Sequence, residues 1–364
     1  MNQVDQCIET EISDSMVMNF MPVVSVLMST YNHEAYIAEA IEGVVGQKTD
    51  FHFELIIGED CSTDNTRRIA LDFQRRYPKI IRVVFSDRNI GAFNNMNRMF
   101  PKARGEFVAW CEGDDFWHNP SKLQKQVDFM RANPDYGLVG AQYDRLVHTA
   151  GSWRRIENWC SRKYGSIPQG NVSLILPVRM YVKTCAMMGR TQLVKQHFDS
   201  NLRSAENSVG DRPLILHMSM LAKIACLAES MATYRRTPGS HVNSGFESLL
   251  LKRKKKIAMD NRLAEAIGMD EKVRMEMQRK NYRLLLYFAA ATRNQEVFDE
   301  AFRWLDVNYP RLVKERTVKL WAFLIKRKAL HSAYFGLRRM LVETLLFLKR
   351  VRPGIRSADE GSPI

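Results

Sequence analysis

The residues of this 364-residue chain best suited to chemistry are acids that stand close together after apolar runs. Glu112, Asp114 and Asp115 lie within four residues and follow Glu106–Cys111, which we expect to be a buried strand. Three carboxylates this close repel one another, and a cation between them would relieve the repulsion. Their hard oxygen atoms suit Mg²⁺ or Mn²⁺ shared with a diphosphate. An Asp-rich turn before the helix that follows Pro120 explains the same residues equally well.

Two further acids stand where a ligand could meet them. Asp60 follows the predicted strand Phe53–Ile57, and its carboxylate could accept a hydrogen bond from a base or a ribose. An Asx turn that stabilises the loop is the alternative. Asp211 precedes Pro213 and a helical run, where an acid is commonly a helix cap. The functional interpretation is a general base that faces the cleft.

Apolar runs alternate with helical segments over the first 141 residues, and Asn32 and Asp64 offer helix N-caps. Parallel strands need helical crossovers, so the alternation predicts an α/β fold with a doubly wound, mostly parallel sheet and helices on both faces. We expect strands at Val23–Ser29, Phe53–Ile57, Ile81–Phe85, Glu106–Cys111 and Leu138–Ala141, and helices at Glu34–Val45, Asp64–Arg76, Phe93–Lys102 and Pro120–Arg131.

Ligands of such sheets bind beyond the carboxyl ends of the strands. Polar residues follow three of the predicted strands, at Ser29–Asn32, Glu59–Asp60 and Glu112–Asp115. The sequence therefore predicts that acids far apart in the chain meet at one edge of the sheet.

These constellations, in this order, resemble those of family 2 glycosyltransferases, which have the GT-A fold. The resemblance covers residues 22–245 and is specific to the family, although it points to no particular donor or acceptor. It rests on VSVLMSTYNHEAYIAEAI, FELIIGEDCSTDNT, RNIGAFNN, GEFVAWCEGDDFWHNPSKLQKQVDF and GDRPLILHMSMLAKIACLAESMATYRRTPGS.

The resemblance implies how the donor nucleotide would be bound. Thr30 and Tyr31 would line the nucleobase pocket, and Asp60 would bind the base. The segment Tyr234–Ser240 is similar to the loop that closes near the diphosphate in the family. A histidine that is often found in that loop is replaced here by Thr237.

The resemblance also implies a metal site and a base. Asp114 would be the direct metal ligand, and Glu112 would contact the ribose or the metal. Family members usually have Asp where this chain has Glu112. Asp115 is the next candidate for the donor site, and Asp211 would be the catalytic base.

The implied activity is a metal-dependent, inverting transfer that uses Mn²⁺ or Mg²⁺. A sugar would pass from a nucleoside-diphosphate sugar, by default a UDP-sugar, to a hydroxyl of a carbohydrate or lipid-linked acceptor. The expected setting is synthesis of a bacterial surface polysaccharide or glycoconjugate. The alternative is a non-catalytic module of the same fold that binds a nucleotide-sugar or nucleic acid.

Several other classes of protein are disfavoured by missing motifs. The chain has neither the G-x-G-x-x-G motif of dehydrogenases nor a P-loop, and His33–Glu34 lacks the second histidine of a zinc protease. The six cysteines include no C-x-x-C pair, which argues against a zinc site or a disulfide scaffold and for a reducing compartment. Nucleic acid is not an expected partner, because the positive charges are scattered through helical segments without stacking aromatics.

Charge divides the chain into two parts. The net charge is +14, and residues 246–364 carry 26 Lys and Arg against 14 Asp and Glu, which gives +12. We therefore expect a flexible segment at residues 1–21, a glycosyltransferase domain at 22–245, a basic helical region at 246–352 and a disordered tail at 353–364. The irregular residues 150–190 would form either part of an acceptor pocket or an ordinary surface excursion.

The basic helical region suggests a membrane surface as one partner. Thr317–Arg352 is amphipathic and basic, which is consistent with contact to an anionic membrane or with packing inside the protein. No secretory signal and no run of about 18 apolar residues is present. The predicted location is the cytoplasm, with peripheral attachment to the inner face of the plasma membrane.

Overall fold

The structure is a computed structural model that describes residues 9–149, 151–200, 202, 211–236, 245–325 and 334. The chain divides into two compact units. The N-terminal unit comprises Met1–Ser240 together with Leu263–Asp270, and the C-terminal unit comprises His241–Arg262 together with Glu271–Ile364.

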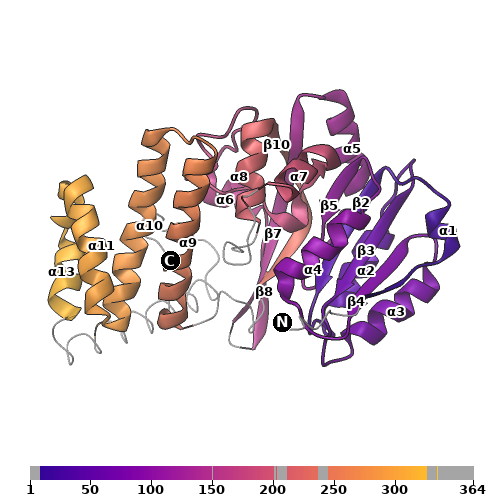
Figure 1. Cartoon of the computed structure of the whole chain (residues 1–364), viewed down its shortest axis with the longest axis horizontal. Coiled ribbons are helices and arrows are strands. Elements are labelled where there is room, and N and C mark those ends of the chain that lie inside the picture. The colour runs from indigo at the N-terminus through magenta and orange to yellow at the C-terminus, as the bar shows by residue number, and fades with distance from the viewer. Residues whose placement is uncertain are drawn as a thin grey trace, which may run out of the picture. The chain divides into compact units, whose positions relative to one another are not determined.

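A mixed sheet forms the centre of the N-terminal unit (Figure 1). Its strand order is β1-β4-β3-β2-β5-β9-β7-β10-β6, and β8 pairs with β7 outside this path. The block β4-β3-β2-β5 is parallel, and so is the pair β7-β10. The strands are β1 (Glu9–Ile12), β2 (Val24–Thr30), β3 (Phe53–Glu59), β4 (Ile81–Ser86), β5 (Phe107–Trp110), β6 (Phe116–Trp117), β7 (Tyr136–Thr149), β8 (Ser152–Ile156), β9 (Met188–Arg190) and β10 (Lys223–Arg236).

Helices connect the parallel strands and cover the sheet (Figure 1). Helix α2 packs on α3, whereas α4 packs on β2 and β3. The chain reverses direction across the sheet between β4 and β5, so right-handed crossovers place α4 on the face opposite α2 and α3. The helices of this unit are α1 (Ser15–Met18), α2 (Ile37–Val45), α3 (Thr66–Arg76), α4 (Gly91–Met99), α5 (Lys122–Ala132), α6 (Trp159–Tyr164), α7 (Thr191–Phe198) and α8 (Arg212–Leu221), with short 3-10 helices η1 (Phe100–Lys102) and η2 (Thr184–Ala186).

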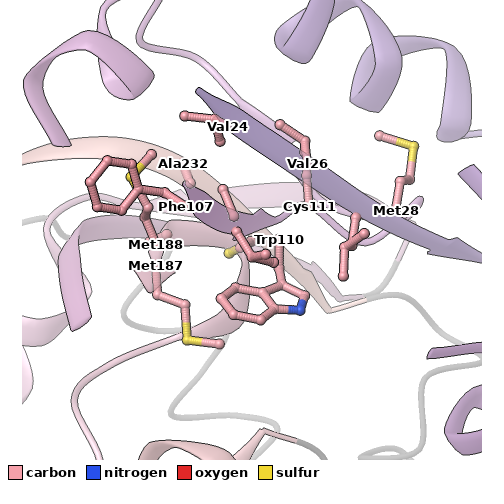
Figure 2. Packing of buried hydrophobic residues seen from close by; sticks show 14 of the residues in the cluster. Val24, Val26, Met28, Phe107, Trp110, Cys111, Met187, Met188 and Ala232 are labelled. Atoms are coloured by element: carbon pink, nitrogen blue, oxygen red, sulfur yellow. The ribbon is translucent and has the colours of Figure 1, made fainter. Parts of the chain in front are cut away.

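The core lies around the strands that the apolar runs predict. Figure 2 shows side chains from β2, β5 and the start of β9 meeting in one buried cluster. Val26, Met28 and Phe107 are fully buried there, and Trp110 is 2% exposed. Because β2 and β5 are covered on both faces, they are mostly apolar and lack the alternation of half-exposed strands.

The starts of two predicted helices are corrected by the structure. Asn32 was expected to cap a helix from Glu34, but it adopts a left-handed conformation with φ 54° and accepts a hydrogen bond from the Thr63 N–H. Helix α2 consequently begins only at Ile37. Pro120 precedes α5, which begins at Lys122, because the Asn119 side chain instead forms a turn by accepting the Ser121 N–H.

Two other stretches hold more structure than the sequence predicts. The short strand expected at Leu138–Ala141 is part of the 14-residue β7, which pairs along its length with β10. Residues 150–190, expected to be irregular, contain β8, α6, η2 and β9. Their pairing with β7 and β5 is a tertiary effect that local residue patterns do not reveal.

A buried ion network ties the first described residues to the sheet. Glu54 on β3 is 1% exposed and pairs with Arg82 at 3.0 Å and with Arg104 at 2.7 Å. Arg82 also pairs with Glu11 at 2.8 Å, which holds β1 beside β4. Residues 9–12 are therefore a strand, where the sequence predicts a flexible segment.

The C-terminal unit is helical and has its own core. Trp321 and Leu324 of α13 are buried in it, whereas Leu320 and Phe323 of the same helix are exposed. The part of Thr317–Arg352 beyond Ile325, apart from Tyr334, lies outside the described residues, as does the predicted tail. The helices are α9 (Phe246–Ala266), which belongs to this unit up to Arg262, α10 (Glu271–Thr292), α11 (Gln295–Asn308), α12 (Pro310–Val313) and α13 (Arg316–Ile325). Within the described ranges, none of them is both long and apolar enough to cross a bilayer.

Substitution of Glu54 tests the buried ion network. Glu54→Ala leaves two arginines without their shared carboxylate, and we expect it to lower the free energy of unfolding by about 3–5 kcal/mol. Glu106 is the matched control, because its ion pair with Arg131 lies at the surface. Glu106→Ala should change stability by less than about 1 kcal/mol. Denaturant unfolding monitored by circular dichroism measures both, and equal effects would contradict the assignment.

Candidate active site

The first part of the candidate site is the carboxyl end of β2. Thr30, the last residue of β2, is buried, and Tyr31 directly after it is 41% exposed. The Asp60 N–H donates to the Thr30 carbonyl at 3.0 Å, so the ends of β2 and β3 are held together. Thr30, Tyr31 and Asp60 therefore lie at one edge of the sheet, where the sequence predicts a nucleobase pocket.

The Asp60 carboxylate is buried and already has two partners. Its oxygens accept the backbone N–H groups of Ile90 and Gly91, each at 2.9 Å, where α4 begins. A negative charge at this position is stabilised by the partial positive charge of the helix N-terminus. A carboxylate has about four lone-pair sites, so a base can still donate to it. Binding of the base by Asp60 stays a prediction. Its hydrogen bonds to Ile90 and Gly91 show that it also stabilises the start of α4.

The acid turn after β5, residues Glu112–Asp115, fits against β2 because of a glycine. The Gly113 N–H donates to the Ser29 carbonyl at 3.0 Å. A Cβ atom on Gly113 would lie 2.6 Å from Thr30 Oγ1 and 2.9 Å from His33 Nδ1, which is closer than real Cβ contacts allow. Thr30 and His33 in turn are hydrogen-bonded at 3.2 Å. The glycine thus brings the acid turn against the predicted nucleotide edge.

Asp115 fastens the acid turn to β10. It is 1% exposed, and its Oδ1 atom accepts the Arg235 N–H at 2.8 Å. Burial raises the pKa of Asp115 well above its usual value, and the charges of Asp114 and Glu112 raise it further. The Arg235 guanidinium donates to the Asp114 carbonyl at 3.1 Å and also pairs with Glu39.

The surroundings of Glu112 are the strongest indication that the acid turn could bind a cation. Burial raises the pKa of Glu112 to about 7 against the opposing effect of the Lys183 charge, and Asp114 and Asp211 raise it as well. Its Oε2 atom is buried without a hydrogen-bond partner. An orphaned carboxylate oxygen among other acids is a state that a bound divalent cation would relieve.

The protein alone does not supply a complete ligand set. In the described parts of the chain, no three His, Cys, Asp or Glu side chains are grouped to hold a metal ion. Mg²⁺ is commonly held by one or two carboxylates and completes its coordination with water and substrate phosphates. The residues present therefore fit a cation that is shared with a diphosphate, with Asp114 and Glu112 as the protein ligands.

Asp211 lies at the start of α8 without capping it. Its side chain makes no hydrogen bond to the first turn of that helix. Instead Oδ2 accepts the Thr184 hydroxyl at 2.5 Å and lies 3.6 Å from Lys183 Nζ. Burial would raise the pKa of Asp211, but Lys183 and the Thr184 hydrogen bonds outweigh it, so the pKa is lowered. No other residue of the described chain hydrogen-bonds to Oδ1.

Lys183 is a residue of the candidate site that sequence reasoning missed. Its ammonium group lies next to Asp211 and acts electrostatically on Glu112 and Asp115 as well. Despite burial, these negative charges raise the pKa of Lys183 well above its usual value. A single lysine in an irregular segment has no spacing that could have revealed this role. Arg235 and His33 were within recognised motifs, but nothing in the sequence singled them out.

The structure thus brings the acid turn and Asp211 into one electrostatic cluster around Lys183. Asp60 joins the same edge through Thr30, which touches both Asp60 and the acid turn. Residues Tyr234–Arg236 of the predicted closing loop end β10. The rest of that loop, including Thr237, lies outside the described residues.

With this geometry in place, comparison with known proteins identifies the unit. Residues 25–196 match the family model described as glycosyl transferase family 2. The N-terminal unit belongs to this family. The α/β fold with a mostly parallel sheet and the helical C-terminal region agree with the expectations from the sequence.

Relatives that match part of this chain occur in several bacteria. An uncharacterized protein of Mycobacterium tuberculosis is 33% identical over 221 residues, which cover 58% of this chain and 58% of the relative. The putative teichuronic acid biosynthesis glycosyltransferase TuaG of Bacillus subtilis is 36% identical over 146 residues, 37% of this chain and 56% of TuaG. The match thus spans little more than half the length of these relatives.

Solved structures share the fold at lower sequence identity. TarS 1–349 of S. aureus, crystallised with UDP-GlcNAc, has a TM-score of 0.50 and 18% identity over 79% of this chain and 91% of that one. The mannosyltransferase PcManGT of Pyrobaculum calidifontis, in complex with GDP-Man and Mn²⁺, has a TM-score of 0.52 and 14% identity over 92% and 89%. At these identities the likeness concerns the fold.

The close approach at Gly113 gives a test of the site geometry. Gly113→Ala would push the acid turn away from Thr30 and His33, and we expect a loss of about 1–3 kcal/mol in the free energy of unfolding. Gly245→Ala is the control, because a Cβ atom there would meet no atom within 4 Å. Thermal unfolding compares the two variants with the parent. An unchanged melting temperature for Gly113→Ala would show that the acid turn is not held against β2.

Proposed function

We propose that the chain is an inverting glycosyltransferase that moves a sugar from a nucleoside-diphosphate sugar to an acceptor hydroxyl. The observation that carries the proposal is the convergence of Asp211, with one free carboxylate oxygen, and the acid turn at one edge of the sheet. An ionised base beside a cation-binding turn is what a single displacement at a sugar carbon requires.

The donor would be held by residues at the ends of β2, β3 and β5. Thr30, Tyr31 and Asp60 would contact the nucleobase, while Asp114 and Glu112 would hold Mn²⁺ or Mg²⁺. When bound, the metal neutralises negative charge on the departing diphosphate. Support for this donor class comes from family membership and from the nucleotide-sugars in TarS and PcManGT, which share the fold. A UDP-sugar is our proposed donor.

The chain's own residues would carry out the proton transfer. Thr184 holds Oδ2 of Asp211, so Oδ1 can point to the acceptor hydroxyl and take its proton. Lys183 keeps Asp211 ionised at neutral pH, as a base requires. The hydroxyl oxygen then forms a bond to the anomeric carbon as the bond from that carbon to the diphosphate breaks. Attack from the face opposite the leaving group inverts the configuration.

The acceptor and setting are proposed by analogy with the relatives. TuaG is named for teichuronic acid biosynthesis, and we propose that this chain also acts in synthesis of a surface polysaccharide or glycoconjugate, on a carbohydrate or lipid-linked acceptor. We also propose that it works in the cytoplasm at the inner face of the membrane. The charge of +12 over residues 246–364 supports attraction to anionic lipid.

The membrane proposal predicts salt-sensitive binding to anionic vesicles. At low ionic strength the protein should sediment with vesicles that contain phosphatidylglycerol, and binding should fall as salt is raised to about 0.5 M because the charges are screened. Vesicles of phosphatidylcholine alone are the control. If the protein stayed in the supernatant with both kinds of vesicle, the proposed membrane attachment would be wrong.

Asp211→Asn should abolish transfer while donor binding persists. An amide cannot accept the proton, and loss of a general base lowers kcat by about 10²–10⁴-fold. Turnover would be measured as release of nucleoside diphosphate from a screened set of nucleotide-sugars with Mn²⁺. Donor binding would be read as a rise in melting temperature. Normal turnover by Asp211→Asn would show that another group is the base.

Asp114→Asn supplies the complementary variant for this experiment. It should lose the Mn²⁺-dependent rise in melting temperature as well as turnover, since it removes the proposed metal ligand. Asp199→Asn, at an exposed ion pair with Lys195, should behave like the parent in both measurements. If no nucleotide-sugar stabilises the parent with or without Mn²⁺, the chain is not a nucleotide-sugar enzyme.

A further inference from the structure

Arg145 on β7 is a cation that no acid of the described residues pairs with. In the described chain its side chain has no ion pair or hydrogen bond, and its Nε atom is buried without a partner. The guanidinium group lies over the Trp159 ring at 4.1 Å from the centroid. Burial lowers the pKa of Arg145, and the nearby charge of Arg236 lowers it further. A partly buried cation with no counterion carries a substantial free-energy cost.

A neighbouring arginine shows that the missing acid is specific to Arg145. Arg155, on the paired strand β8, forms an ion pair with Asp144 at 2.6 Å. Asp144 directly precedes Arg145 in the chain, but its side chain serves Arg155, Ser230 and the Asn158 N–H. The nearest acid in the sequence is therefore fully engaged elsewhere.

A second cation lies at the same aromatic ring. Tyr234 has Lys183 Nζ at 4.4 Å from its ring centroid and the Arg145 guanidinium at 5.9 Å. Asp211 is paired with Lys183 at 3.6 Å and balances that charge. Asp114 and Asp115 also act electrostatically on Tyr234. Among the described residues, however, no acid forms an ion pair with Arg145, so its positive charge lacks the direct partner that Lys183 has in Asp211.

The orientation of Arg145 suits recognition of a planar or tetrahedral anion. The guanidinium carbon lies over the Trp159 ring, and a guanidinium that meets an aromatic ring with its face keeps the N–H groups along its edge for other partners. The unpartnered Nε–H is one of these edge donors. Such an edge can donate two parallel hydrogen bonds to a carboxylate or phosphate, and stacking fixes the group in advance.

We propose that Arg145, with Tyr234 and Trp159, forms a subsite for an anionic group, a carboxylate or a phosphate, on the acceptor sugar. This inference rests on the proposed function, because it takes Asp211 as the base that meets the acceptor hydroxyl. Lys183 contacts both Tyr234 of the subsite and Asp211, the proposed base. We therefore assign an anion bound at Arg145 to the acceptor, whose hydroxyl Asp211 would deprotonate. The donor phosphates have a separate place at the acid turn.

Direct binding of matched sugars tests the subsite without requiring turnover. p-Nitrophenyl β-D-glucuronide and p-nitrophenyl β-D-glucoside differ only at C6, which is a carboxylate in the first and a hydroxymethyl group in the second, and glucose 1-phosphate supplies the phosphate form. By isothermal titration calorimetry, the parent should bind the glucuronide at least about tenfold more tightly than the glucoside, as expected for a charge-assisted hydrogen bond. Arg145→Gln should remove that preference and leave glucoside binding unchanged.

Two further variants and one further ligand complete the experiment. Arg145→Lys keeps the charge without the paired donors and should retain only part of the preference. Arg162→Gln, at an exposed arginine of α6, should retain all of it. Equal affinity of the parent for glucuronide and glucoside overturns the subsite. So does an Arg145→Gln variant that weakens UDP binding with Mn²⁺ as much as glucuronide binding, because the anion would then be the donor diphosphate.

Failure of the proposed function would look different. In that case no nucleotide-sugar would be turned over by the parent, whatever its preference between the two glycosides. A charged-glycoside preference that depends on Arg145 would then identify an anionic-sugar subsite in a chain that is not a transferase.

Discussion

The repulsion among the carboxylates of the acid turn is the constraint on which the site depends. Glu112, Asp114 and Asp115 are forced together by the turn after β5, and burial makes their shared negative charge more costly. The protein offsets part of this cost from outside the turn. Arg235 donates to Asp114 and Asp115 from β10, and Lys183 acts on Glu112 from the segment before η2. The negative charge of the acid turn that these groups leave unbalanced is what would favour binding of a cation.

The sheet makes this arrangement possible because it fixes distant segments at one edge. The turn between β5 and β6 is hydrogen-bonded to β2 through Gly113 and to β10 through Asp115. Strand β10 carries Tyr234 and Arg235 to the same place, and η2 places Thr184 against Asp211. The side chains are thus set by backbone pairings that form with the core, so the site is largely organised before any ligand arrives.

Sequence reasoning recovered the parts of this molecule that local patterns encode. Buried apolar runs gave the parallel strands, since a strand covered on both faces has no polar alternation. The positions of Asp60, the acid turn and Asp211 after strands or before a helix followed from the same reading. Residues whose importance is tertiary escaped it. Lys183 matters because Asp211 lies beside it and Glu112 acts on it electrostatically. Arg145 matters because no acid of the described residues pairs with it. Neither condition leaves a trace in local spacing. The prediction that Asn32 caps a helix was wrong for a related reason. Its side chain accepts a hydrogen bond from the N–H of Thr63, which is 31 residues away in the sequence.

The hydrogen bonds from Ile90 and Gly91 to Asp60 have a consequence for selectivity. A carboxylate anchored at both oxygens cannot swing to follow a ligand, so if Asp60 binds the base as we propose, it would present the heterocycle with a fixed acceptor. A base that carries an N–H where that acceptor lies is matched without reorganisation, whereas one that carries a carbonyl there meets a like partial charge. Discrimination between uracil-type and other bases at this position would then come from the fixed position of the Asp60 carboxylate. The first turn of α4 would contribute to base selectivity because it holds that carboxylate in place.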